Sequence, residues 1–161
     1  MRQINVGDIT DGVRRACIEA CTVLPNDVVK ALQHALEIEE SPTGKDVLRQ
    51  LIENAEIART EGVPICQDTG VALVAVVLGQ DLHVTGGYLY DAINEGVRRG
   101  YTDGNLRKSM VRHPLDRVNT GDNTPAVIYT TIVPGDKLRI TIAPKGAGSE
   151  NMGAVKALKP S

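Results

Sequence analysis

The stretch that decides the fold is the apolar run Val71-Ala72-Leu73-Val74-Ala75-Val76-Val77-Leu78. Its length and its valine content predict a β-strand that is buried on both faces. The run is too short to cross a bilayer as a helix. Gly79-Gln80-Asp81 is typical of a turn, and Leu82-His83-Val84 is a candidate continuation of the sheet.

On the N-terminal side of this strand, about sixty residues have the apolar spacing of helices. A first helix is predicted with Asp8 or Thr10 as its N-cap. Pro25 fits the first turn of a second helix. Ser41-Pro42 opens a third helix, and Gly62 fits its end.

On the C-terminal side, a helix is predicted from about Tyr88 to Arg99. Residues 101 to 124 are polar and rich in turn formers, and a loop of this length is usually functional or mobile. Ala126 to Val133 is a second strong strand, and Pro134-Gly135-Asp136 turns the chain back into Leu138 to Ile142, which alternates as a half-buried strand.

These segments predict a single domain over residues 1–161 in the α+β class, with N-terminal helices packed against a mainly antiparallel or mixed β-sheet. Hydrophobic residues make up 42% of the chain and charged residues 24%, as in soluble globular proteins. The net charge of −2, with no Phe or Trp, gives no basis for binding nucleic acid or an anionic membrane. We therefore expect neither partner.

The three cysteines are an odd number, so they cannot form a complete internal set of disulfides. The N-terminus, Met1 to Asn5, lacks the apolar segment of a signal peptide. Together these features predict a cytoplasmic protein in a reducing environment.

Before the apolar run lies a loop of unusual composition, Cys66-Gln67-Asp68-Thr69-Gly70. Cys66 is a candidate metal ligand, with a small buried residue or a reactive nucleophile as the alternatives. Asp68 is a candidate general base, or else a residue that shapes the turn. Gln67 could contact a ligand through its amide but indicates little alone.

Cys17 and Cys21 lie within the apolar stripe of the first helix and are predicted to be core residues. A four-cysteine metal site cannot be built from three cysteines. The segment from Gly104 to Arg117 carries five potential cations, which would suit an anionic substrate or simply be a solvated loop. Lys145-Gly146-Ala147-Gly148-Ser149 follows a strand, and its glycines allow either an anion-binding turn or a flexible strand end.

Three segments together resemble a known family: Cys66 to Gly70, Leu106-Arg107-Lys108-Ser109, and Lys145 to Asn151. Their order and spacing are similar to the N-terminal part of the α subunit of class I (iron–sulfur) fumarate hydratases, a pattern shared by the tartrate dehydratase α subunit. The resemblance covers essentially the whole chain.

The resemblance implies a [4Fe–4S] cluster held by three cysteines, with Cys66 as the first, and an open iron acting as a Lewis acid. It implies that Asp68 works with a β-subunit threonine on the carbon-bound proton. It also implies that Gln67 and Arg107 contact substrate carboxylates, and that Gly146-Ala147-Gly148 provides a backbone contact to substrate.

The implied reaction is reversible hydration of fumarate to malate, with a β subunit as partner, a dicarboxylate as substrate, and a heterotetramer or a homodimer of α as the assembly. In the family the α subunit continues past the position of Ser161 and carries the other two cluster cysteines there. We therefore expect this chain to be an incomplete α subunit that is inactive alone. The alternatives are a tartrate dehydratase α subunit, a non-catalytic module that docks a partner, and a hydrolase with Cys66 as nucleophile.

Overall fold

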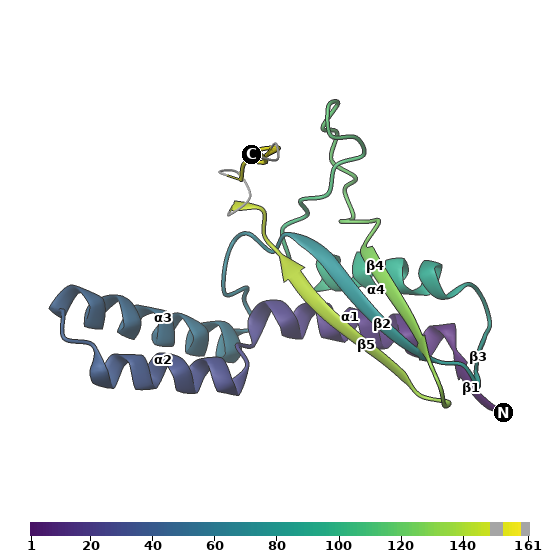
Figure 1. Cartoon of the computed structure of the whole chain (residues 1–161), viewed down its shortest axis with the longest axis horizontal. Coiled ribbons are helices and arrows are strands. Elements are labelled where there is room, and N and C mark those ends of the chain that lie inside the picture. The colour runs from purple at the N-terminus through teal and green to yellow at the C-terminus, as the bar shows by residue number, and fades with distance from the viewer. Residues whose placement is uncertain (149–152, 159–161) are drawn as a thin grey trace.

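The computed structural model describes residues 1–148 and 153–158. Its helices are α1 (Val6–Thr22), α2 (Asn26–Ile38), α3 (Pro42–Glu61) and α4 (Leu89–Asp103). Its strands are β1 (Arg2–Asn5), β2 (Val71–Gly79), β3 (Leu82–Thr85), β4 (Val127–Val133) and β5 (Leu138–Lys145) (Figure 1). The predicted α+β class with a mixed sheet is confirmed.

The helix ends follow local capping chemistry. Ser41 caps α3 by accepting a hydrogen bond from the Gly44 N–H, and Gly62 ends the helix in the left-handed conformation, as predicted. The predicted caps of α1 are wrong. Asn5 takes that place, because its side chain accepts a hydrogen bond from the Gly7 N–H at 2.8 Å.

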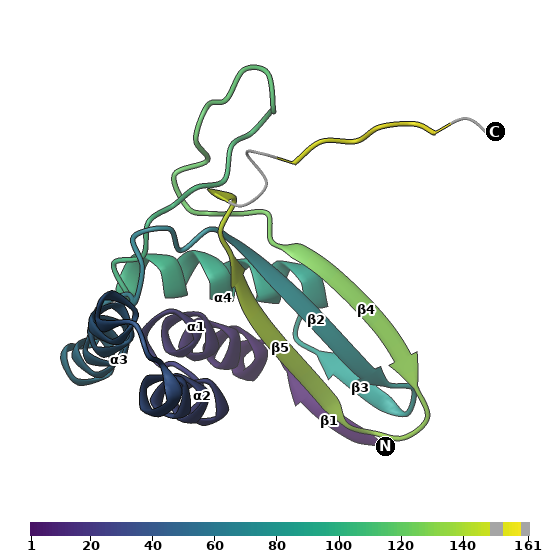
Figure 2. The same ribbon diagram turned by 60° about the vertical axis from the view of Figure 1, so that its left-hand side comes forward.

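The main sheet has the strand order β4-β2-β5, with β4 parallel and β5 antiparallel to β2. Although β4 and β5 are consecutive in sequence, they lie on opposite sides of β2 (Figure 2). The turn between them crosses the end of β2, where the Gly79 N–H donates to the Lys137 carbonyl at 2.7 Å. The prediction that β3 continues this sheet is wrong, because β3 pairs in parallel with β1 in a separate sheet.

The core lies between one face of the sheet and the helices α1 and α4. Alternate residues of β2, namely Ala72, Val74 and Val76, are buried against these helices. The two helices approach closely through glycines of α4: a Cβ at Gly96 would lie 2.6 Å from the Cβ of Val13. A side chain at residue 96 would therefore push α1 and α4 apart.

The other face of the sheet is open over the described residues. Ala75 of β2 and Tyr129 of β4 are exposed there, and Val77 is only half-buried. The prediction that β2 is buried on both faces is therefore wrong for this part of the chain, since α1 and α4 both pack on the same face of the sheet (Figure 2).

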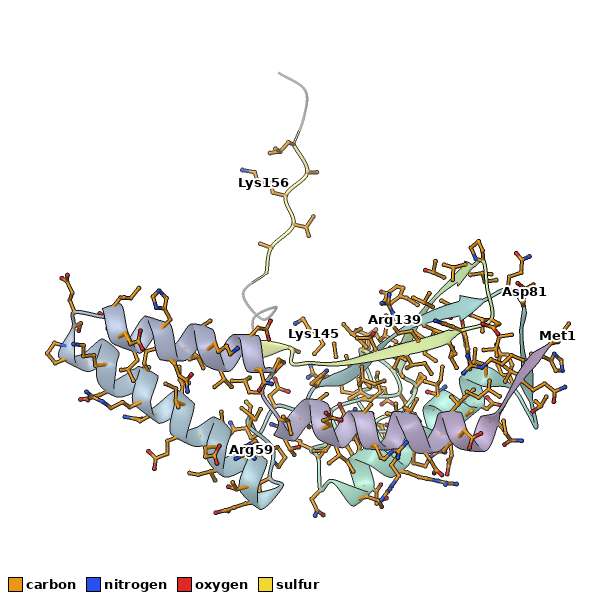
Figure 3. The ribbon with its side chains drawn as sticks, turned by 90° about the horizontal axis from the view of Figure 1, so that it is seen from below. Met1, Arg59, Asp81, Arg139, Lys145 and Lys156 are labelled. Atoms are coloured by element: carbon orange, nitrogen blue, oxygen red, sulfur yellow. The ribbon has the colours of Figure 1, made fainter. Side chains whose placement is uncertain are left out.

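Helices α2 and α3 form a hairpin that extends away from the sheet (Figure 1). In Figure 3 this hairpin extends to the left, whereas β5, which carries Arg139 and Lys145, runs to the right. Within the described ranges, no helix is both long and apolar enough to span a membrane.

Candidate functional site

The Cys66–Gly70 loop joins α3 to β2, and its backbone is fixed by tertiary hydrogen bonds. Just ahead of it, the Ile65 N–H donates to the Cys21 carbonyl of α1, and the Asn54 side chain of α3 donates to the Ile65 carbonyl, both at 2.9 Å. The loop is therefore anchored to two helices before its polar side chains begin. Such anchoring suits a site that must hold functional groups in fixed positions.

At the other end of the loop, Gly70 makes a close approach that only glycine allows. Its φ is +57°, and a Cβ there would lie 2.0 Å from the carbonyl oxygen of Lys145 in β5. Gly70 thus brings the loop directly against the end of β5, where the Gly146-Ala147-Gly148 segment begins.

The carboxylate of Asp68 joins these two segments. One oxygen, Oδ1, accepts from the Gly70 N–H at 3.2 Å, and the other, Oδ2, accepts from the Ala147 N–H at 3.2 Å. A Cβ at Gly146 would lie 2.8 Å from Oδ2, so the missing side chain at that position makes room for the carboxylate. Asp68 shapes its own turn and also reaches a distant segment, so the contact alone does not choose between the two predicted roles.

Cys66 and Asp68 face the same hollow. The Cys66 thiol is exposed and accepts a hydrogen bond from the Asp68 N–H at 3.4 Å. Its exposure rules out the alternative of a buried core residue. The hollow is lined by Ala20, Cys21, Ile65, Cys66, Asp68, Thr69 and Pro144. Gln67, between them in sequence, is exposed.

The described residues do not form a complete metal site. They contain no group of three His, Cys, Asp or Glu side chains placed to hold a metal ion. Cys17 and Cys21 are buried in the core, as predicted, and burial raises their pKa values to about 12 and about 11, respectively. Neither thiol belongs to a group of three metal-ligating side chains among the described residues. Cys66 alone is exposed and able to serve as one ligand.

The Arg107 segment lies beside the loop. The Thr69 hydroxyl donates to the Arg107 carbonyl at 2.7 Å, while the Arg107 side chain is exposed. Beyond it the chain folds back on itself, with Val111 bridging to Asn119. His113 shapes this turn, because its Nδ1 accepts from the Leu115 N–H at 3.2 Å.

The structure therefore brings Asp68 together with Gly146 and Ala147, and it brings the backbone of Arg107 against the same loop. Gly148 is exposed, and a Cβ there would meet nothing within 4 Å. The Ser149-Glu150-Asn151 part of the third motif lies outside the described residues.

Two buried residues of this region were not predicted from the sequence. The Tyr101 hydroxyl donates to the Thr69 carbonyl at 2.8 Å, and the Asn123 side chain donates to the Gly70 carbonyl at 3.1 Å. A buried Tyr requires a partner for its hydroxyl, and an Asn within a turn signal often adopts a left-handed conformation, as Asn123 does with φ 61°. A tyrosine in the apolar face of a helix and an asparagine in a turn were therefore the sequence signals for Tyr101 and Asn123.

Asp122, the residue before Asn123, has a carboxyl group whose pKa lies well below its ordinary value. Burial alone would raise the pKa of Asp122. Hydrogen bonds from the N–H and hydroxyl of Thr124 and from Arg98 outweigh burial and lower that pKa to about 2. Asp122 thereby fastens the chain next to Asn123 to helix α4, which carries Arg98.

The family model described as Fumarate hydratase (Fumerase) matches residues 10–161. The chain belongs to the fumarate hydratase family. Among its relatives, the putative L(+)-tartrate dehydratase subunit alpha of Methanocaldococcus jannaschii is 40% identical over 159 residues, which are 95% of this chain and 55% of that protein. The anaerobic class I fumarate hydratase of Escherichia coli K12 is 39% identical over 126 residues, 76% of this chain and 22% of that protein.

The L(+)-tartrate dehydratase subunit alpha of Escherichia coli UTI89 is 30% identical over 164 residues, 99% of this chain and 54% of that protein. The chain thus spans about half the length of the α subunits that it matches, and less of the fumarate hydratases. Membership of a hydro-lyase family is shown, and the matched relatives include both fumarate hydratases and tartrate dehydratase subunits.

Proposed function

We propose that this chain supplies one half of the active site of a hydro-lyase that interconverts malate and fumarate, and that a β subunit supplies the other half. One observation carries the proposal. The Asp68 carboxylate is held by N–H groups from two separate segments, and it opens on the hollow that the Cys66 thiol also lines.

In the dehydration direction, Asp68 receives the proton from the carbon next to a substrate carboxylate, in concert with a β-subunit threonine. An ionised carboxylate has about four acceptor positions. The Gly70 and Ala147 N–H groups use two of them, so acceptor capacity remains for the substrate proton. The same two N–H groups fix the orientation of the carboxylate before the substrate arrives, which lowers the barrier to proton transfer.

The developing negative charge on the substrate carboxylate needs cationic and N–H donors. Arg107 meets this need in our proposal because its guanidinium is exposed and suits bidentate binding of a carboxylate. Gln67 adds an amide contact. The Ala147 N–H is already engaged by Asp68, so we assign the backbone contact to Gly146 and Gly148 on either side.

Cys66 is proposed as one thiolate ligand of a [4Fe–4S] cluster. When bound, such a cluster supplies a Lewis acid to a substrate oxygen. The described residues offer no complete ligand set, so the remaining ligands come from elsewhere in the assembled enzyme. The relatives named as alpha subunits support a β subunit as the partner. For the assembly we propose a heterotetramer or a homodimer of α. We place the enzyme in the cytoplasm.

The experiment uses these residues within an α chain of the length its relatives have, assembled anaerobically with the β subunit and loaded with iron. Fumarate hydration is followed by loss of ultraviolet absorbance from its double bond. L(+)-tartrate is assayed in parallel, because relatives of both kinds match at nearly equal identity. Turnover of fumarate supports the proposal. Turnover of L(+)-tartrate alone would show that tartrate, and not fumarate, is the substrate. Turnover of neither compound by an iron-loaded assembly would refute a hydro-lyase site.

A further inference from the structure

Two buried polar side chains hold the Cys66–Gly70 loop in place: Asn123 links it to the segment that follows Arg107, and Tyr101 links it to helix α4. We propose that Asn123, assisted by Tyr101, is a positioning residue that fixes the location of Asp68 relative to Arg107 and thereby sets the rate of turnover. This inference rests on the proposed function for its catalytic consequence, and on hydrogen bonds alone for its structural part.

The carboxamide of Asn123 connects two separate turns. Its Oδ1 accepts from the Ser109 N–H at 2.7 Å and the Met110 N–H at 3.1 Å. Its Nδ2 donates to the Gly70 carbonyl at 3.1 Å. The side chain is fully buried, so water does not compete for these three hydrogen bonds.

The position requires an amide on a short side chain. A carboxylate would accept from the two N–H groups but could not donate to the Gly70 carbonyl, and an aliphatic residue would do neither. The backbone φ of 61° is one that Asn adopts more readily than most residues. Both requirements point to Asn at residue 123.

Tyr101 and Thr69 form a second connection next to the first. The Tyr101 hydroxyl donates to the Thr69 carbonyl at 2.8 Å, and the Thr69 hydroxyl donates to the Arg107 carbonyl at 2.7 Å. A tyrosine hydroxyl has an ordinary pKa of about 10, so it is protonated and can donate at neutral pH. Burial raises the pKa of Tyr101 further. The loop is thus fastened at residues 69 and 70 to the chain on both sides of Lys108.

These links act directly on the proposed chemistry. Asp68 immediately precedes Thr69, and Arg107 lies two residues before Ser109. A movement of one segment against the other changes the distance between the proposed base and the proposed carboxylate anchor. Misplacement of a reacting group by roughly 1 Å can reduce a rate by about 10²-fold.

The test is Asn123→Gly in the assembled, iron-loaded enzyme. Glycine accepts the left-handed φ without strain and removes the side-chain hydrogen bonds. The matched control is Asn105→Gly, because Asn105 also has a left-handed φ, of 51°, but is exposed and its side chain makes no hydrogen bond within residues 1–148. We expect kcat per bound cluster to fall about 30- to 100-fold in Asn123→Gly, with a smaller change in KM and unchanged iron content. Asn105→Gly should keep kcat within about twofold.

A folded, iron-loaded Asn123→Gly enzyme with normal kcat would overturn the inference. Should that variant not fold, Tyr101→Phe decides, since it removes only one hydroxyl: a several-fold loss of kcat supports the inference and an unchanged kcat overturns it. Hydrogen exchange separates the inference from the proposed function. Even if no dicarboxylate is turned over, Asn123→Gly should accelerate exchange of the Ala147 N–H, which donates to Asp68. An unchanged exchange rate at Ala147 would show that Asn123 does not position that carboxylate.

Discussion

Gly70 is the position where a single methyl group should do the most damage to the site. Alanine at this position must adopt a φ of +57°, which costs about 1–2 kcal/mol for a residue with a Cβ. Its Cβ would also lie 2.0 Å from the Lys145 carbonyl oxygen, so the end of β5 must move away, at a further cost of about 1–3 kcal/mol. We therefore expect Gly70→Ala to lower the free energy of unfolding by about 2–5 kcal/mol.

Gly62 provides the matched control. Its φ is +66°, but a Cβ there would meet nothing within 4 Å, so Gly62→Ala should lose only the conformational part, about 1–2 kcal/mol. Urea unfolding of this chain, followed by far-ultraviolet circular dichroism, measures both. Equal losses for the two variants would refute the claim that Gly70 is fixed by its approach to β5.

Three further predictions follow from the same geometry. In the native chain iodoacetamide should alkylate the exposed Cys66 first. Cys17 and Cys21 are buried, with pKa values raised to about 12 and about 11, and should react only on unfolding. Peptide mapping that finds Cys17 labelled as fast as Cys66 would contradict the placement of Cys17 in the core. Cys66→Ser in the assembled enzyme should lose bound iron with no loss of folded protein, and full iron retention would remove Cys66 from the ligand set. Because its pKa is lowered to about 2, Asp122 stabilises the fold by at most about 2 kcal/mol above pH ~4, and this contribution disappears as the pH falls towards about 2. Asp122→Asn should therefore be less stable than wild type at neutral pH, with the difference shrinking over that interval; a constant difference would argue against the lowered pKa.

Local signals predicted the parts of the fold that local chemistry controls. The caps of α3 at Ser41 and Gly62 and the strand at β2 could be located from residue types alone. The pairing of strands could not. Whether β5 lies beside β4 or across β2 depends on where the chain travels after Val133, and nothing within either strand records that path.

In the candidate site, too, local sequence indicates some residues, and others are important only through long-range contacts. Cys66 and Asp68 are conspicuous because exposed loops rarely combine a thiol with a carboxylate in this way. Asn123 is as deeply involved, yet it looks like an ordinary turn residue, since its importance arises from partners 53 and 14 residues away. The contact between Asp68 and Ala147, 79 residues apart, likewise depends on the antiparallel pairing of β2 with β5.

The most direct test of the central claim is the turnover of fumarate by assembled enzyme carrying Asp68→Asn. Asparagine keeps the size of the side chain and one acceptor oxygen but cannot take up the substrate proton. The control is Asp81→Asn, at the exposed turn between β2 and β3 at the opposite end of the sheet (Figure 3). We predict that Asp68→Asn retains iron and substrate binding while kcat falls by about 10²- to 10⁴-fold, and that Asp81→Asn is unaffected. A normal kcat in an iron-loaded Asp68→Asn enzyme would contradict the account.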